Sequence, residues 1–257
     1  MLLHVLLMWV PFIFVLSVLT YVFVFDFKTR TVSNWVWIFA YPIGCAMTLV
    51  NIVFNLVDVS AVLVSFGCSL FLGLGLLCSG FYGSADAKAL VFLGLSLPVV
   101  PFVFSSVLGV SVLPVVLVVF CASAILSLVW PLSIFILNLK DLFVMRKTMF
   151  DGISLTVREK GWLFFTARKV SIEKLGGLGY FPAEQVVLLE GEPTRVLVHF
   201  VKAETNLEKY WNNILSYGEL YRGGVLVSPT IPSICFLVIA LAILPLGNLF
   251  VGGIVVF

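Results

Sequence analysis

The segment Leu2–Asp26, LLHVLLMWVPFIFVLSVLTYVFVFD, runs for 24 residues without an Asp, Glu, Lys or Arg before it reaches its carboxylate. A helix that crosses a bilayer needs roughly 20 mostly apolar residues, so this segment is long enough to span a membrane. No basic residue precedes it, and it ends at Asp26 rather than at a small-residue cleavage site. These features favour a retained membrane helix over a cleaved signal peptide.

The composition extends this interpretation to the whole chain. Of its 257 residues, 61% are apolar and only 11% are charged, and the mean hydropathy is +1.18. A soluble domain carries about a quarter charged residues, so a soluble globular protein is excluded. Six membrane spans are predicted, and the fifth is long enough that we expect it to tilt or to extend into the cytoplasm. They cover Leu2–Phe25, Trp35–Phe54, Val59–Cys78, the short Ser84–Leu97, a part of Leu108–Leu139, and Ile231–Val256.

A polar segment separates the fifth and sixth spans. Residues Lys140–Arg222 hold 22 of the 28 charged residues. Alternating and β-branched stretches predict strands, Gly-containing pairs predict turns, and apolar residues at helical spacing predict one helix. The strands are expected at Ile153–Val157, Trp162–Thr166 and Val196–Val201, the turns at Gly176–Gly177 and Gly191–Pro193, and the helix at Leu207–Leu215.

The predicted fold is therefore an all-α polytopic membrane bundle of six transmembrane helices, with a small β-rich cytoplasmic domain inserted before the last helix. The expected boundaries are 1–139 for helices 1 to 5, 140–229 for the soluble domain and 230–257 for helix 6.

The positions of the basic residues predict the orientation. Lysine and arginine gather at alternate ends of the spans, at Lys28, Arg30, Lys88, Lys140, Arg146 and Lys147. The loops near Asn55–Ser60 and Pro98–Ser106 contain no basic residue. The positive-inside rule places the basic ends and the soluble domain in the cytoplasm. A multi-pass protein of the cell membrane is expected, with its N- and C-termini outside.

Only three acidic residues lie outside the polar segment: Asp26, Asp58 and Asp86. Asp58 falls in a short external loop, where water solvates it. Asp26 ends the first span and Asp86 begins the fourth, both on the cytoplasmic side. A carboxylate at the hydrocarbon boundary costs a few kcal/mol unless it faces protein or water. Two carboxyls within about 3 Å share a proton, which is the arrangement that aspartyl hydrolysis uses.

Each of these acids also has a structural interpretation. Asp26 can be an ordinary charge at a helix end, and Asp86 can stabilise the first turn of a helix through its dipole. Lys88 can be a positive-inside anchor, and Lys28 and Arg30 can bind lipid phosphates. The small residues around Gly83 allow the close approach of another backbone.

At these residues the chain resembles the type IV prepilin and archaeal preflagellin peptidases, which are membrane aspartyl proteases of the G-x-G-D class. The first family motif is matched by Asp26, Lys28, Arg30 and Asn34. The second, G-x-(G/A)-D-x-K, is matched by Gly83, Ala85, Asp86 and Lys88, with Ser84 and Ala87 at the variable positions. The resemblance implies that Asp26 and Asp86 are catalytic and that the other motif residues support them.

Departures from the family pattern indicate which branch of the family the chain resembles and which of the family's activities to expect. The loop after the first span is short and lacks the paired C-x-x-C motifs of bifunctional bacterial enzymes, so no methyltransferase activity is expected. Ser33 replaces a common proline, and Ala85 replaces a glycine. A soluble segment before the last span is most similar to the archaeal preflagellin peptidases. The resemblance implies that the chain cleaves leader peptides from preflagellin or type IV pilin-like precursors.

Two other classes stay open. Carboxylates in a membrane also mark ion pathways, so an ion-coupled transporter is possible, although the chain lacks repeat symmetry. A non-catalytic scaffold of a secretion machine is the third. The five cysteines lie in apolar runs without C-x-x-C pairs, so no metal site is expected. We expect no cofactor and no nucleic-acid partner, with the lipid bilayer and the precursor leader peptides as partners.

Overall fold

The computed structural model describes residues 2–80, 83–99, 113–146, 148–172, 179–189, 191–198, 208–221, 223–229 and 232–252. The chain divides into two compact units. The first contains Met1–Leu126 and Pro232–Phe257, and the second contains Ser127–Ile231. The described residues are mostly helical, with a small β region. The placement of the second unit in the cytoplasm stays a prediction.

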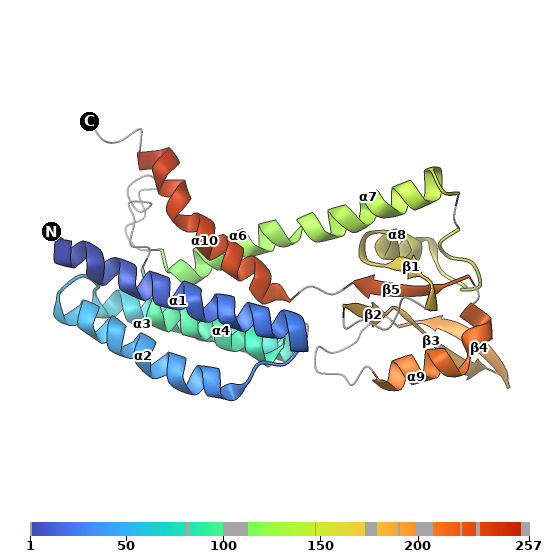
Figure 1. Cartoon of the computed structure of the whole chain (residues 1–257), viewed down its shortest axis with the longest axis horizontal. Coiled ribbons are helices and arrows are strands. Elements are labelled where there is room, and N and C mark those ends of the chain that lie inside the picture. The colour runs from blue at the N-terminus through green and yellow to red at the C-terminus, as the bar shows by residue number, and fades with distance from the viewer. Residues whose placement is uncertain are drawn as a thin grey trace. The chain divides into compact units, whose positions relative to one another are not determined.

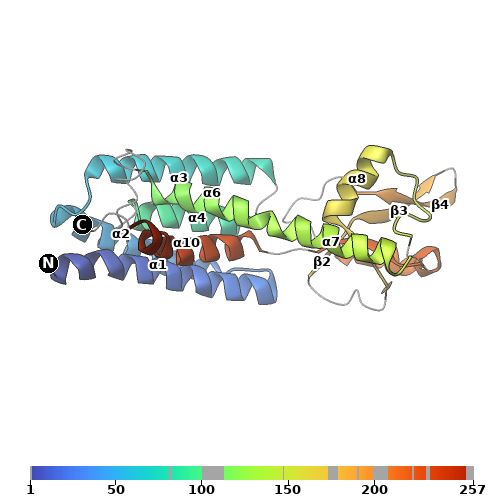
Figure 2. The same cartoon turned by 90° about the horizontal axis from the view of Figure 1, so that it is seen from above.

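The first unit is built from helices (Figure 1). They are α1 (Leu2–Thr29), α2 (Asn34–Val53), α3 (Val59–Ser79), α4 (Ser84–Ser96), α6 (Val115–Ser127) and α10 (Ser233–Gly252). The turns between the first helices are short and follow local sequence. The Ser33 side chain accepts a hydrogen bond from the Trp35 amide at the start of α2, and Gly80 ends α3 in the left-handed conformation. Figure 2 shows α1, α3 and α4 side by side.

Helix α4 lies at the centre of this unit, packed against α1, α2, α3 and α10. Its 13 residues rise about 20 Å, less than the roughly 30 Å of a hydrocarbon core. Small residues let its neighbours approach closely, since a Cβ on Gly94 would collide with the Ser69 side chain. The Ser65 hydroxyl donates to the Gly94 carbonyl at 2.9 Å, and the Thr48 hydroxyl donates to the Leu95 carbonyl at 2.8 Å. Protein rather than lipid therefore surrounds α4.

Four helices are long and apolar enough to cross a membrane: Trp9–Thr29, Asn34–Val53, Val59–Ser79 and Val115–Phe143. They correspond to the first, second, third and fifth predicted spans, although residues 108–112 of the fifth lie outside the described residues. A shorter apolar helix, Ser233–Pro245, falls where the sixth span is expected. Several apolar helices thus support a membrane protein, and the total of six spans stays a prediction.

The second unit combines helices with two small antiparallel sheets. Its helices are α7 (Val129–Phe143), α8 (Val157–Thr166), α9 (Glu208–Ser216) and the 3-10 helix η2 (Gly218–Tyr221). Its strands are β1 (Arg168–Val170), β2 (Tyr180–Pro182), β3 (Glu184–Leu189), β4 (Glu192–Leu197) and β5 (Val225–Pro229). One sheet has the order β1-β5-β2, and the other is the hairpin β3-β4.

The residues that pair across neighbouring strands define the register of each sheet. Lys169 faces Leu226 and Phe181 faces Ser228 in the first sheet, and Val186 faces Arg195 in the hairpin.

Two of the predicted strands are wrong. Residues 153–156 form no strand, and Trp162–Thr166 belong to α8. The helix is favoured by a capping box, because the Glu159 amide donates to the Thr156 hydroxyl and the Thr156 amide donates to the Glu159 carboxylate. The buried Asn138 side chain on α7 then donates to the carbonyls of Phe164 and Ala167 at the other end of α8.

The remaining predictions for the polar segment concern one helix, two turns and one strand. The predicted helix at Leu207–Leu215 is confirmed by α9 over its described part. A turn is confirmed at Gly191, which has a φ of 90°, while the two residues after it already belong to β4. Of the strand expected at Val196–Val201, the first two residues belong to β4, residue 198 lies beyond its end, and residues 199–201 lie outside the described residues. The predicted turn at Gly176–Gly177 also lies outside them.

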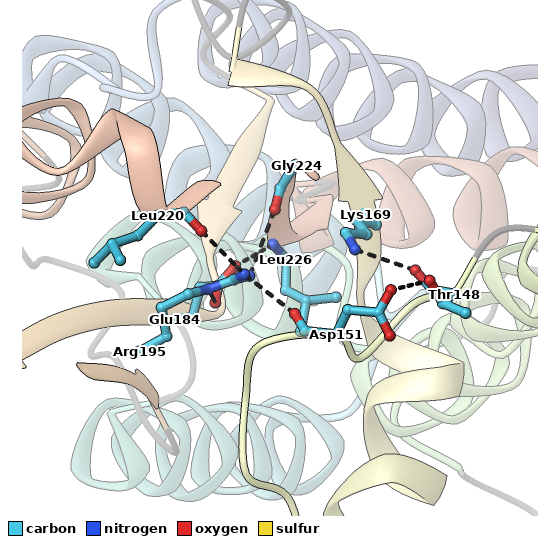
Figure 3. Close-up of polar contacts among 8 residues, drawn as sticks. All are labelled: Thr148, Asp151, Lys169, Glu184, Arg195, Leu220, Gly224 and Leu226. Carbon is cyan, nitrogen blue, oxygen red and sulfur yellow. Dashed lines mark hydrogen bonds and ion pairs between the residues drawn. The ribbon is translucent and has the colours of Figure 1, made fainter. Parts of the chain in front are cut away.

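The second unit holds a buried ion pair between Glu184 on β3 and Arg195 on β4 (Figure 3). The guanidinium donates to both carboxylate oxygens, at 2.9 and 2.8 Å, and the Leu226 amide donates to one of them at 2.6 Å. The remaining guanidinium hydrogens point to the carbonyls of Asp151, Leu220 and Gly224. The pair thus ties both sheets and two loops together.

Tyr221 completes this cluster. The Arg195 guanidinium lies 4.7 Å from the centre of its ring, a cation–π geometry. Burial and the neighbouring Glu184 carboxylate raise the pKa of the Tyr221 hydroxyl above its ordinary value, and Arg195 opposes them. The tyrosine is therefore neutral throughout the physiological pH range.

Candidate active site

Asp26 lies in the last turn of α1 and is half-buried. The helix ends because Arg30 adopts a left-handed φ of 56°, while its amide still donates to the Asp26 carbonyl at 2.9 Å. The Arg30 side chain interacts electrostatically with the Asp26 carboxylate. The predicted supporting residue Arg30 therefore accompanies Asp26, whereas Lys28 is exposed at the same helix end.

Asp86 lies in the first turn of α4. The Gly83 amide donates to Asp86 Oδ2 at 3.2 Å, and the Asp86 amide donates to the Gly83 carbonyl at 3.2 Å. This reciprocal pairing satisfies amides that a helix start leaves without partners, and negative charge is favourable there. The structural role considered for Asp86 is thus present.

Gly83 has an unstrained backbone. Its φ is −73°, and a Cβ built on it would lie 3.8 Å from Asp86 Oδ2, which is ordinary contact. The resting fold therefore does not require glycine at this position. Ala85 is half-buried and packs against the hydrophobic core of the unit.

The carboxylates of Asp26 and Asp86 interact electrostatically as like charges. Asp26 and Asp86 are 60 residues apart in the sequence, but the helices that carry them, α1 and α4, pack together. The end of α1 and the start of α4 therefore meet at one end of the helical unit. Two neighbouring carboxyls that resist simultaneous ionisation are suited to acid–base work, because one can hold a proton while the other accepts one.

The first turn of α10 also reaches this site. The Ser233 hydroxyl and the Ile234 amide interact with the Asp86 carboxylate. Asp86 Oδ1 and Ser233 Oγ are nevertheless buried without a fully formed hydrogen bond among the described residues. Ser233 was not predicted from the sequence, since no motif contains it and its position depends on the packing of α10 against α1 and α4.

Two predicted supporting residues, Asn34 and Lys88, form a direct contact. The Lys88 ammonium donates to Asn34 Oδ1 at 2.7 Å, which links the first turn of α2 to α4. The Tyr41 hydroxyl, further along α2, donates to the Lys88 carbonyl at 2.9 Å. The two sequence motifs are therefore joined to each other beside Asp86. Tyr41 was not predicted, because an isolated tyrosine in an apolar span carries no distinguishing signal.

No group of three or more His, Cys, Asp or Glu side chains within the described residues is placed to hold a metal ion. The site is thus described by its carboxylates and their polar neighbours.

The first unit is defined by an apolar helical bundle with two interacting carboxylates at one end. Residues 13–132 match the model of the type IV leader peptidase family, a segment that covers just under half of the chain and includes both Asp26 and Asp86. This match supports a prepilin-type peptidase, and hence a protease that acts on leader peptides. A search of curated proteins finds no match for the chain.

Proposed function

We propose that this chain is a membrane aspartyl endopeptidase of the type IV leader peptidase family, with Asp26 and Asp86 as its catalytic pair. The observation that carries the proposal is that the packed helices α1 and α4 hold these two interacting carboxylates, in the last turn of one and the first turn of the other, within the segment that matches the family. Its substrates are the short leader peptides of preflagellin or type IV pilin-like precursors, cleaved at the cytoplasmic membrane face.

The chemistry follows from sharing one proton between two carboxyls. The ionised carboxylate removes a proton from water, whose oxygen attacks the scissile carbonyl carbon. The protonated carboxyl donates its proton to the carbonyl oxygen, which gives a neutral tetrahedral intermediate. One carboxyl then gives its proton to the amide nitrogen while the other carboxylate takes a proton from a hydroxyl of the intermediate, so the C–N bond breaks, the carboxylic acid product forms and the pair again holds a single proton. No covalent enzyme intermediate forms.

The surrounding residues favour an asymmetric pair. Asp86 is held by the Gly83 amide in a helix turn, whereas Asp26 faces the positive charge of Arg30. The Asn34–Lys88 contact fixes α4 against α2 next to Asp86. Such different surroundings separate the roles of two chemically similar carboxyls.

The part of the precursor around the scissile bond is expected to approach the site as an extended chain, since peptide bonds in a helix are shielded from attack. Gly83 and Ala85 lie in the turn that carries Asp86, and small side chains there leave room for another backbone. The glycine that the resting fold does not need is consistent with this use.

The test is cleavage of a tagged preflagellin or pilin-like precursor by membranes that contain the protein. Asp26→Asn and Asp86→Asn should each abolish loss of the leader while membrane insertion is unchanged. Asp58→Asn, in a loop between α2 and α3, is the matched control and should cleave normally. Normal cleavage by either catalytic variant would contradict the proposal.

A further inference from the structure

We propose that Ser233, the first residue of α10, is a positioning residue for the Asp86 carboxyl during leader cleavage. This inference rests on the proposed function and adds to it a third helix. Ser233 lies 101 positions beyond the last residue of the family match, so the match does not assign it a role.

The start of α10 is fixed firmly against the helices that carry the two carboxylates. Helix α10 packs against α1 and α4. Ile234 is completely buried in the same hydrophobic cluster as Leu90 and Leu93 of α4. Because a close-packed core resists movement, this turn stays in register with the start of α4.

Two groups of this turn face Asp86 for a physical reason. The first amides of a helix lack partners inside it, and the positive end of the helix dipole favours a nearby carboxylate. The Ile234 amide is one such group, and it interacts with Asp86 together with the Ser233 hydroxyl. The Gly83 amide holds the other side of the carboxylate, at Oδ2. Asp86 thus lies in the first turn of α4, beside the first turn of α10, which packs against the same helix.

The contact with Ser233 is incomplete in the resting structure. Ser233 Oγ and Asp86 Oδ1 are both buried, and neither has a fully formed hydrogen bond to any of the residues that the structure describes. Buried polar atoms are nearly always hydrogen-bonded, and leaving one unpaired is costly. A hydroxyl reorients by rotation about one bond, so Ser233 can follow the carboxyl as its proton state changes.

This adaptability suits a carboxyl that must switch roles. A serine hydroxyl donates to an ionised carboxylate and accepts from a protonated one. Ser233 therefore keeps the Asp86 carboxyl in one orientation at both stages of the reaction. Since the hydroxyl acts through Asp86 and not through the substrate, its loss should lower kcat and leave KM unchanged.

The experiment uses the full-length protein in detergent micelles with a tagged precursor. Ser233→Ala should lower kcat about tenfold to a hundredfold, the range expected for a hydrogen bond to a charged group, with KM within about twofold. Ser233→Thr keeps the hydroxyl and should restore kcat to within about threefold of the original. If Ser233→Ala does not fold, Ser233→Cys keeps the volume with a weaker donor and carries the same expectation.

Ser123→Ala is the matched control, because its buried hydroxyl donates to the Phe120 carbonyl of its own helix and to no other described residue. It should leave kcat unchanged. A Ser233→Ala kcat within twofold of the original, or an equal loss in Ser233→Thr, would overturn the positioning role. If Asp86→Asn is inactive while Ser233→Ala is fully active, only this inference fails. If Asp86→Asn is active, the proposed function itself fails.

Discussion

Asp86 and Glu184 are two carboxylates of one chain, placed in the two different units and held in opposite ways. Glu184 is completely buried, but Arg195 pairs with both of its oxygens and the Leu226 amide adds a third donor. Within the described part of the chain, Asp86 has one amide at Oδ2, a buried Oδ1 without a full hydrogen bond, and a second carboxylate that interacts with it. The more deeply buried acid is therefore the better satisfied one.

This difference is the one that we expect between a structural carboxylate and the carboxylate that we propose to be catalytic. A buried charge is tolerated where its partners neutralise it and fill its hydrogen-bonding positions, as at Glu184. A carboxylate that faces a like charge with an unsatisfied oxygen gains no comparable stabilisation, which is typical of a site kept for chemistry. Exchange of one residue in each unit should therefore affect stability in one case and activity in the other.

The largest effect on stability is expected from Arg195→Met. The change leaves Glu184 buried without its counterion, and such a loss costs about 3–5 kcal/mol. The temperature at which the second unit unfolds, monitored by limited proteolysis of the full chain, should be markedly lower in the variant. Arg168→Met is the control, because its ion pair with Asp141 is partly exposed and is worth about 0–1 kcal/mol. Equal shifts for the two variants would contradict the structural role of the pair.

A smaller effect, on rate, is expected from the contact that joins the two motifs. Lys88→Ala and Asn34→Ala should each lower the cleavage rate about tenfold, because the start of α4 loses its side-chain hydrogen bond to the first turn of α2. The double variant should be no slower than the slower single one, since both remove the same contact.

Thr48→Val is the control for this cycle. It removes a hydrogen bond between the same two helices, to the Leu95 carbonyl near the end of α4, and should leave the rate unchanged. Additive losses in the double variant would show that Asn34 and Lys88 act separately.

The smallest effect is expected at a third kind of carboxylate, the half-buried Glu159 of the α8 capping box. Thr156→Ala removes the side chain that accepts from the Glu159 amide and should lower the free energy of unfolding of the second unit by about 1 kcal/mol. Thr166→Ala, which removes only a hydroxyl contact within α8, should change it by less than 0.5 kcal/mol in roughly the manner of a surface substitution. Denaturant titration of the full chain distinguishes them, and an equal loss would contradict the cap.

Much of the helical unit could be predicted from sequence, because uninterrupted apolar runs such as Trp35–Phe54 have few alternative structures in a membrane. The second unit was harder. Trp162–Thr166 has aromatic and β-branched residues typical of a strand, yet a capping box before it and Asn138 on α7 favour a helix. The Thr156–Glu159 spacing was a local signal that could have been used. The contacts of Asn138 were not accessible, because they depend on tertiary packing.

The same distinction holds in the site. Asp26, Asp86, Asn34 and Lys88 were selected from motifs, and the structure brings both pairs together. Tyr41 and Ser233 were not selected, because a tyrosine or serine in an apolar run is common. Their roles depend on which helix packs against α4, and one sequence does not specify that packing. Lys28 was selected from a motif, and it is exposed at the end of α1.

The central claim is that Asp86 serves catalysis whereas Glu184 serves the fold. The most direct test measures leader cleavage and thermal unfolding on the same preparations of Asp86→Asn and Glu184→Gln, each a change from carboxyl to amide. We predict that Asp86→Asn unfolds at the original temperature or above and cleaves no precursor, whereas Glu184→Gln unfolds at a lower temperature and still cleaves below it. Cleavage by folded Asp86→Asn would contradict the account.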